Sequence, residues 1–304
     1  MSMDSPWNTW SIARPAGLEW GSRSGAGEGQ DRPTVERKDE AMDLRLKGKR
    51  ALVSGSTAGI GLAIASALAG EGARVIVNGR AQPSVDAAVE QIRSTTGGEA
   101  QGFAGDLTLA SAAEDLARAH PEVDILVNNL GIFEPKPFEE IPDADWVRFF
   151  EANVLSGVRL ARLYLPAMRR ANWGRIIFIS SESAVQIPAE MIHYGMTKTA
   201  QLVISRGLAE MTTGTAVTVN AVLPGPTASE GVNKFVDGLA KAKGIDRGSI
   251  EHAFFSEGRP TSIIQRFIKP EEIAALVAFV CSPLASAING AALRADGGVV
   301  RSIA

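Results

Sequence analysis

The sequence predicts an α/β protein built as a single doubly wound domain, with a seven-stranded parallel sheet flanked by helices on both faces. Three observations support this fold class. From Arg50 onward, short apolar segments alternate with longer segments of helical periodicity. The short segments are apolar on both faces, which is typical of strands buried inside a parallel sheet. The third is that a helical segment separates each strand from the next over most of the chain, and right-handed crossovers of this kind give a doubly wound sheet with helices on both sides.

The strands are expected where the short apolar runs stand. They are Ala51–Ser54, Arg74–Asn78, Ala100–Ala104, Asp124–Asn128, Arg175–Ser180, Ala216–Val222 and Ala291–Arg294. Helices are expected between them, and the second helix ends at Gly97-Gly98 because glycine commonly terminates helices. The helical regions are Ile60–Ala69, Ser84–Thr95, Ser111–Ala119, Trp146–Arg169, Tyr194–Met211 and Glu271–Cys281.

The composition is that of an ordinary globular protein and argues against several functions. The chain has 304 residues, of which 45% are hydrophobic and 21% charged. A formal net charge of −3 gives no electrostatic basis for binding nucleic acid. No apolar run approaches the roughly 20 residues of a membrane span, so no membrane contact and a cytoplasmic location are expected. The histidines lack metal-binding spacing, and Cys281, the only cysteine, is expected to be a buried and inert thiol.

The first 41 residues differ from the rest of the chain. Residues 1–41 are rich in Gly, Ser, Pro, Arg and Glu, and we expect them to be a disordered extension. Met42 immediately precedes the first strand region, and we interpret it as the physiological start, with the extension not native. A short partner-binding tail is the alternative. Residues 42–304 then form the domain, including a substrate-lid segment at 226–270.

Three polar residues point to proton transfer. If the segment after His193 is helical, Tyr194 and Lys198 lie one turn apart on one face. A nearby ammonium favours the phenolate and is expected to pull the tyrosine pKa from about 10 toward neutral. The Ser181 hydroxyl can hold a carbonyl or alcohol oxygen at the same point. The alternative is a chance Tyr-x-x-x-Lys spacing. His193 is expected at the surface, at a helix start, and the alternative is that it approaches the site.

A glycine-rich turn follows the first strand. Residues 54–61 read Ser-Gly-Ser-Thr-Ala-Gly-Ile-Gly, between a strand and its helix. Glycines there permit a tight turn and a close approach of backbone to a pyrophosphate, and the helix N-terminus favours the anion. In a βαβ context this is typical of a Rossmann dinucleotide-binding domain. A plain tight connection is the alternative.

The end of the second strand bears on the choice of cofactor. A carboxylate at this place would bind the ribose hydroxyls and repel a 2′-phosphate. The sequence has Gly79 there instead, followed by Arg80, whose guanidinium can pair with a phosphate. This favours NADP over NAD, although NAD stays possible because Arg80 can equally be a solvated surface residue.

At this point the residues resemble the short-chain dehydrogenase/reductase family in its classical form. The resemblance covers Leu44 to Gly298, with its motifs in family order and spacing. The motif residues are Gly55, Gly59, Gly61, Asp106, Asn128-Asn129-Leu130-Gly131, Asn153, Ser181, Tyr194, Lys198, Pro224-Gly225 and Asp296-Gly297-Gly298. The resemblance implies an NAD(P)-dependent oxidoreductase that transfers a hydride between a nicotinamide cofactor and a carbonyl or secondary alcohol.

The family also implies four catalytic residues. Tyr194 would be the general acid/base, and Lys198 would lower its pKa and hydrogen-bond the nicotinamide ribose. Ser181 would hold the substrate oxygen. Asn153 would position a water that links Lys198 to solvent.

The implied cofactor site spreads over the carboxyl ends of the strands. Its residues are Gly55, Ser56, Thr57, Gly59, Ile60, Gly61, Arg80, Asp106, Leu107, Asn128, Gly131, Tyr194, Lys198, Gly225 and Thr227. Asp106 would sit against the adenine, and Thr227 would approach the nicotinamide carboxamide. Leu130 replaces the usual alanine and adds bulk near the cofactor. Glu182 and Ser183 are expected as surface turn residues, with Ser183 as a spare hydroxyl near the substrate in the alternative.

The segment after Pro224 is longer than the sheet requires, and we expect its helices to close over the cleft as a lid. The substrate is expected to be a small-molecule carbonyl compound or the corresponding alcohol. Family analogy implies a homotetramer or dimer. A non-catalytic dinucleotide sensor or scaffold on the same fold is the alternative function. The intact Asn153, Ser181, Tyr194 and Lys198 argue against it.

Overall fold

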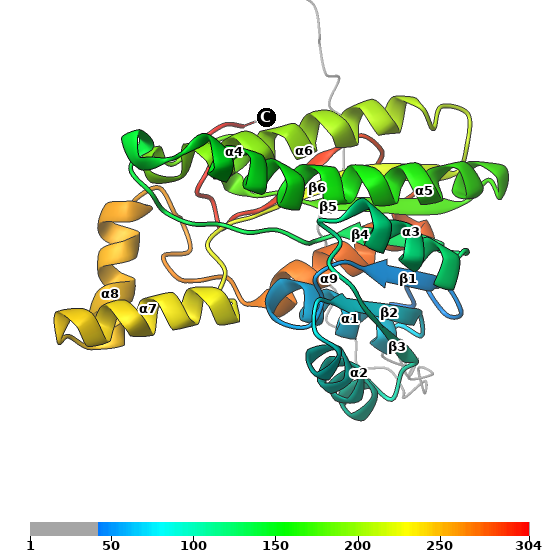
Figure 1. The fold of residues 1–304 in the computed structure, drawn as a ribbon, viewed down its shortest axis with the longest axis horizontal. Helices are drawn as coiled ribbons and strands as arrows, with labels where there is room; N and C mark the ends of the chain where they lie inside the picture. Colours follow the sequence, from blue (N-terminus) through cyan, green and yellow to red (C-terminus); the bar gives the residue numbers. More distant parts are fainter. Residues whose placement is uncertain (1–41, 304) are drawn as a thin grey trace, which may run out of the picture. The chain divides into compact units, whose positions relative to one another are not determined.

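A seven-stranded parallel sheet organises the residues that the computed structural model describes, 42–303 apart from the side chains of Phe235 and Lys243 (Figure 1). The strand order is β3-β2-β1-β4-β5-β6-β7, and every neighbouring pair is parallel. The strands are β1 Arg50–Val53, β2 Arg74–Gly79, β3 Ala100–Ala104, β4 Ile125–Asn128, β5 Gly174–Ile179, β6 Val217–Pro224 and β7 Ala292–Ala295. The predicted fold class is confirmed. The predicted extension 1–41 lies outside the described residues.

The strand order reverses between β1 and β4. The chain proceeds outward from β1 through β2 to β3 and then crosses back to β4 on the other side of β1. In open α/β sheets, ligands bind at the carboxyl ends of the strands beside such a switch point. The topology therefore places the expected cofactor site where the turns after β1 and β4 meet.

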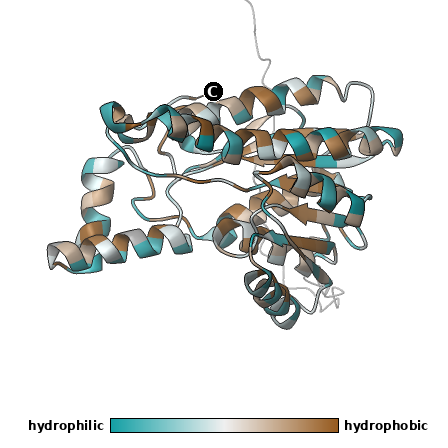
Figure 2. Ribbon diagram, viewed as in Figure 1, coloured by the Kyte–Doolittle hydropathy of each residue, from teal (hydrophilic) through white to brown (hydrophobic). Residues whose placement is uncertain are grey.

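Helices cover both faces of the sheet. On one face lie α1 Gly59–Gly70, α2 Gln82–Thr96 and α9 Pro270–Cys281. On the other face lie α3 Ala110–Ala119, α5 Ser156–Arg170 and α6 Ile192–Glu210. Short 3-10 turns stand at Phe138–Glu140, Glu182–Ala184, Ala189–Met191 and Pro283–Ala285. In Figure 2 the strands are mostly hydrophobic, whereas the helices alternate hydrophobic and hydrophilic stripes.

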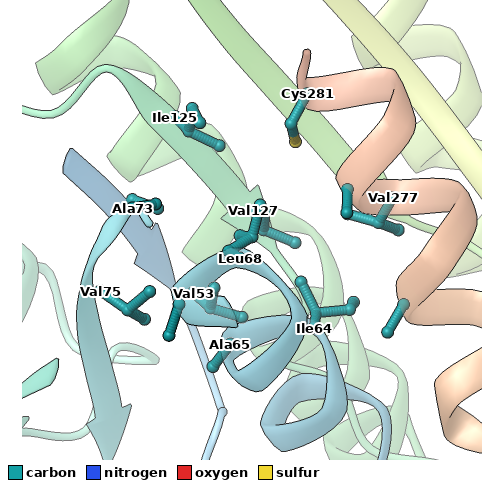
Figure 3. Close-up of a cluster of buried hydrophobic side chains, with 14 of the residues drawn as sticks. Val53, Ile64, Ala65, Leu68, Ala73, Val75, Ile125, Val127, Val277 and Cys281 are labelled. Atoms are coloured by element: carbon teal, nitrogen blue, oxygen red, sulfur yellow. The ribbon is translucent and has the colours of Figure 1, made fainter. Parts of the chain in front are cut away.

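The core consists of two clusters, one on each face of the sheet. Successive strand residues point to opposite faces. Val53 and Val127 pack against α1 and α9, as Figure 3 shows, while Leu52 and Leu126 pack on the side of α3 and α5. Cys281 belongs to the first cluster and is fully buried. Burial raises the pKa of its thiol to about 12, which fits an inert cysteine.

The long helical region predicted at 146–169 is interrupted. It consists of α4 Asp143–Phe150, a π-helical turn at Glu151–Leu155, and α5. A π turn carries one extra residue per turn, and such turns occur frequently at functional sites. Asn153 lies in the middle of this one and is buried.

Two helices lie to one side of the sheet, in the segment predicted as a lid (Figure 1). They are α7 Glu230–Lys243 and α8 Arg247–Ala253, followed by a π turn at Phe254–Gly258. Their apolar faces, with Phe267, form a small cluster of their own. The lid function itself stays a prediction. Among residues 42–303, no helix is long and apolar enough to cross a membrane.

Candidate active site

A cavity of about 820 Å³ opens at the carboxyl ends of the central strands. The glycine turn after β1 forms one wall, and the segments that follow β4, β5 and β6 form others. The start of α6 and parts of the segment 226–267 complete the lining. The cavity therefore joins the predicted phosphate turn, three of the four predicted catalytic residues and the predicted lid.

The glycine turn has the geometry of an anion cradle. Gly55 and Gly59 adopt φ of 61° and 56°, which side chains disfavour. A Cβ on Gly61 would lie 2.4 Å from the Gly55 carbonyl oxygen, so only glycine fits there. Helix α1 begins with no side-chain cap and no acidic residue in its first turn. Its first N–H groups and positive dipole end are therefore suited to a pyrophosphate, and the turn fits a dinucleotide.

Ser56 and Thr57 support this turn from behind. The Ser56 hydroxyl donates to the Val53 carbonyl at 2.7 Å and accepts from the Asn78 amide at 3.0 Å, so it ties β1 to β2. A Cβ on Gly79 would lie 2.4 Å from the Thr57 methyl group. The place where a ribose-binding acid would stand is therefore filled by Thr57, which explains the glycine.

Other predicted cofactor residues are not part of the cavity lining. Arg80 is exposed, and Asp106 accepts hydrogen bonds from the backbone and hydroxyl of Thr108. The Leu107 side chain is buried in the core cluster beside α3. Asn128 is buried, and within residues 42–303 its amide nitrogen and oxygen have no hydrogen-bond partner.

The structure brings most of the remaining predicted residues to the lining of this one cavity. The predicted residues that line the cavity are Gly55, Gly59, Ile60, Gly61, Gly131, Ser181, Tyr194, Lys198, Gly225 and Thr227. A Cβ on Gly131 would lie 3.4 Å from Lys198 Nζ, and Thr227 donates to the Gly225 carbonyl at 2.8 Å. This grouping places the proton-transfer residues and the phosphate turn on one continuous cavity.

Asn153 lies outside the cavity lining, and its side chain links two of the segments that form the lining by hydrogen bonds. Its Nδ2 donates to the Ile132 carbonyl at 3.0 Å and to Thr197 Oγ1 at 2.9 Å, and its Oδ1 accepts from the Ile132 amide at 2.7 Å. The π turn therefore joins the segment after β4 to α6. Gln201 adds a second link, because its Nε2 donates to the Asn153 carbonyl at 2.6 Å while its Oε1 accepts from Lys198 Nζ at 3.3 Å.

The electrostatics of Tyr194 and Lys198 differ from the prediction. Burial raises the pKa of Tyr194, the Glu182 carboxylate raises it further, and the hydrogen bond with Ser181 opposes both. Burial lowers the pKa of Lys198 to about 7, against the pull of Glu182. The expected lowering of the tyrosine pKa is therefore wrong for the protein by itself. Burial disfavours phenolate and ammonium alike, and the nearby Glu182 carboxylate, a residue expected at the surface, disfavours the phenolate further.

Glu182 is the main residue that sequence reasoning misplaced. Glu182 and Ser183 were expected at the surface, but both are buried. The Ser181 hydroxyl donates to Glu182 Oε2 at 2.5 Å. Arg259, from the end of the π turn after α8, brings Nε to 3.5 Å from Glu182 Oε1. Adjacency to Ser181 was a usable signal for Glu182, whereas its partner is far away in the sequence.

His193 is also buried, contrary to the surface position expected. Its ring centroid lies 4.1 Å from that of Phe149 and 6.0 Å from that of Trp146. The cause is that α6 begins at Ile192 and packs its first turn against α4. Burial lowers the pKa of His193.

Within residues 42–303, no group of three or more His, Cys, Asp or Glu side chains could hold a metal ion.

A glycine cradle at a switch point, beside a buried Ser181 and Lys198 and a half-buried Tyr194, defines a dinucleotide-dependent oxidoreductase. Residues 49–239 match the sequence model of the family described as short chain dehydrogenase. The chain belongs to this short-chain dehydrogenase/reductase family and is an NAD(P)-dependent enzyme. The family resemblance and the enzyme class are thereby confirmed.

Relatives cover nearly the whole described chain. The chain is 55% identical over 264 residues to the uncharacterized oxidoreductase YvaG of Bacillus subtilis (strain 168), and the match covers 86% of this chain and 100% of that protein. It is 36% identical over 260 residues to D-beta-hydroxybutyrate dehydrogenase of Cupriavidus necator, covering 84% and 99%. The crystal structure of L-sorbose reductase from Gluconobacter frateurii with NADPH and L-sorbose matches at a TM-score of 0.81 and 32% identity, covering 86% and 100%.

Proposed function

We propose that the enzyme interconverts a small carbonyl compound and its secondary alcohol, with Tyr194 as the general acid/base and NADP as the preferred cofactor. The observation that supports this is that Ser181, Tyr194 and Lys198 line the same cavity as the glycine turn. Hydride and proton must reach the carbon and the oxygen of one carbonyl group, so the acid and the cofactor site must share one cavity.

The roles of the side chains follow from their contacts. The bound nicotinamide cofactor would exchange a hydride with the substrate carbon. Ser181 holds the substrate oxygen once its hydroxyl proton turns from Glu182 to that oxygen, and Tyr194 exchanges a proton with it. Lys198 Nζ donates to the Ile179 carbonyl at 2.9 Å and lies 5.5 Å from the Tyr194 ring centroid. With a pKa of about 7, Lys198 can carry a charge that steadies a developing phenolate.

The catalytic role is tested by removing one hydroxyl. The chain has two tyrosines, so the same substitution can be made at Tyr194 as the test and at Tyr164 as the control. Tyr194→Phe should abolish consumption of reduced NADP with a panel of ketones while nucleotide binding persists. Tyr164→Phe changes a buried tyrosine whose hydroxyl donates to the His120 carbonyl at 3.1 Å, outside the cavity lining, and should keep activity. Equal turnover in both variants would remove Tyr194 from the mechanism, whereas nucleotide binding without turnover of any ketone by the unaltered protein would favour the non-catalytic sensor.

The NADP preference has support from two sides. Gly79 leaves no acid to repel a 2′-phosphate, with Arg80 beside it. The related L-sorbose reductase was crystallised with NADPH. Arg80→Ala should raise the KM for NADPH about tenfold or more and leave that for NADH nearly unchanged. Arg74→Ala, an exposed change at the opposite end of β2, should alter neither. Equal use of both cofactors by the unaltered protein would contradict the preference.

A homo-oligomer is proposed on family analogy. Apolar side chains stand exposed on α4, α5 and α6, among them Val147, Leu163 and Val203. Pairing of these helices around a two-fold axis would cover them. Light scattering on the purified protein should give a dimer or tetramer, and a monomeric mass would contradict the proposal.

A further inference from the structure

Two charged side chains of opposite sign stand in the cavity wall beside Ser181. Glu182 follows Ser181 in the chain, and Arg259 comes from the segment after α8. The exposed fractions of their side chains are only 7% for Glu182 and 11% for Arg259. Charged groups are rarely this well buried unless closely paired or engaged with a ligand. Whether this pair is closed on itself or open to a ligand therefore depends on the distances between its charged atoms.

The ion pair is loose. Arg259 Nε lies 3.5 Å from Glu182 Oε1, and Arg259 Nη1 lies 3.4 Å from Glu190 Oε1. A well-formed charge-assisted hydrogen bond between such groups measures about 2.7–2.9 Å. The other carboxylate oxygen of Glu182 is only 2.5 Å from Ser181 Oγ. Glu182 is thus held tightly on the serine side and faces Arg259 across a wider gap.

The two side chains that border this gap restrict which chemical group of a substrate can bind between them. A substrate group there meets a carboxylate that only accepts and a guanidinium that only donates. A carboxylate would be repelled by Glu182, and an ammonium would be repelled by Arg259. A hydroxyl can donate to Glu182 and accept from Arg259 at the same time, without adding charge.

The position of the gap fixes where that hydroxyl stands in the substrate. Under the proposed function, the reacting oxygen lies at Ser181, which Glu182 directly contacts. We propose that Glu182 and Arg259 form a recognition site for a hydroxyl group next to the reacting carbonyl, so that the substrates are α-hydroxy ketones rather than plain ketones. This inference rests on the proposed function. The neighbouring wall is apolar, with Phe133 and Phe254, and suits the carbon chain of such a substrate.

The test compares ketones that differ only in the hydroxyl. Purified enzyme with NADPH is assayed with 3-hydroxy-2-butanone against 2-butanone, and with hydroxyacetone against acetone. We expect kcat/KM to favour the hydroxylated member of each pair by about 100-fold or more, because a site built to bind a hydroxyl rejects the analogue without it. Turnover of plain ketones with no gain from the hydroxyl would overturn the recognition site and leave the proposed function standing. Absence of turnover with every ketone would overturn both.

Variants separate recognition from a merely structural contact. Glu182→Gln and Arg259→Lys should each reduce the preference for the hydroxylated ketone at least about tenfold. A contact that only fastens the segment after α8 would lower kcat/KM for both members of a pair equally, and that result would overturn the inference. Glu257→Gln removes the same charge as Glu182→Gln from an exposed side chain two residues before Arg259, and should keep the preference. The wild-type ratio tests the inference even if a variant fails to fold.

Discussion

Replacing Gln201 by leucine should cut the buried link between Lys198 and the π turn. The Gln201 side chain is 1% exposed and makes two hydrogen bonds, to the Asn153 carbonyl at 2.6 Å and from Lys198 Nζ at 3.3 Å. Leucine has a similar size but no polar atoms. Since the site is buried, water has little access to replace the lost partner.

The size of the effect follows from these two contacts. Leaving the Asn153 carbonyl without this donor costs about 1–3 kcal/mol, and the longer bond from Lys198 adds about 1 kcal/mol. The free energy of unfolding should therefore fall by about 2–4 kcal/mol, which lowers Tm by roughly 4–16 °C for a domain of this size. The loss of an acceptor also disfavours the ammonium form, so the pKa of Lys198 should fall below its present value of about 7.

Two measurements check this prediction. Thermal unfolding followed by circular dichroism should show the lower Tm. In the pH profile of kcat/KM, the limb on which activity falls as Lys198 loses its proton should move to lower pH. Gln91→Leu, on the exposed side of α2, is the matched control and should change stability by less than about 0.5 kcal/mol. A lower Tm with an unchanged pH profile would refute the coupling to Lys198, and an unchanged Tm would refute the energetic argument.

Three further predictions concern single side chains. Lys198→Met should abolish activity yet stabilise the fold. The pKa of Lys198 is near 7 in the folded protein and 10.5 in the unfolded chain, so the free-energy penalty for burying the ammonium is full below pH 7 and disappears as the pH rises toward 10.5. In urea unfolding, the free energy of unfolding of the variant should exceed that of the wild type by several kcal/mol at pH 6 and by much less at pH 10. A difference that grows with pH would contradict the reasoning. Cys281 should react with a thiol reagent only when the protein unfolds, since it is buried with a pKa near 12; rapid labelling of the native protein would show that the core opens locally. Gly79→Asp should weaken binding of both NADPH and NADH in fluorescence titrations, because a Cβ at this position would lie 2.4 Å from the Thr57 methyl group. Combining it with Thr57→Gly removes that clash, so binding of NADH should be restored while the new carboxylate still repels the 2′-phosphate of NADPH.

The sequence was most informative where local chemistry decides structure. Apolar runs located all seven strands to within about two residues, and the glycine turn was placed correctly at the end of β1. Gly61 shows why this works. The same absence of a side chain that is visible in the sequence is what the crowded turn requires.

Features set by packing between distant segments could not be predicted in this way. The π turn at Glu151–Leu155 is held by hydrogen bonds from Asn153 to the segment after β4, and helical periodicity does not register them. Glu182 is buried facing Arg259 at 3.5 Å, and the two residues are far apart in the sequence, so only the fold brings them together. Burial of Tyr194 itself and the Glu182 carboxylate both raise the pKa of Tyr194, so the prediction from Lys198 alone had the wrong direction for this pKa shift.

The π turn between α4 and α5 also makes the length of this segment critical. Each residue of an α-helix turns the chain by about 100°, so a residue deleted within Glu151–Leu155 would rotate the whole of α5 relative to α4. Its apolar side, which includes Leu160 and Leu165, would then swing away from the sheet. Homologous sequences should therefore vary in amino-acid identity here far more freely than in length, and an alignment gap at this point should mark a rebuilt active site.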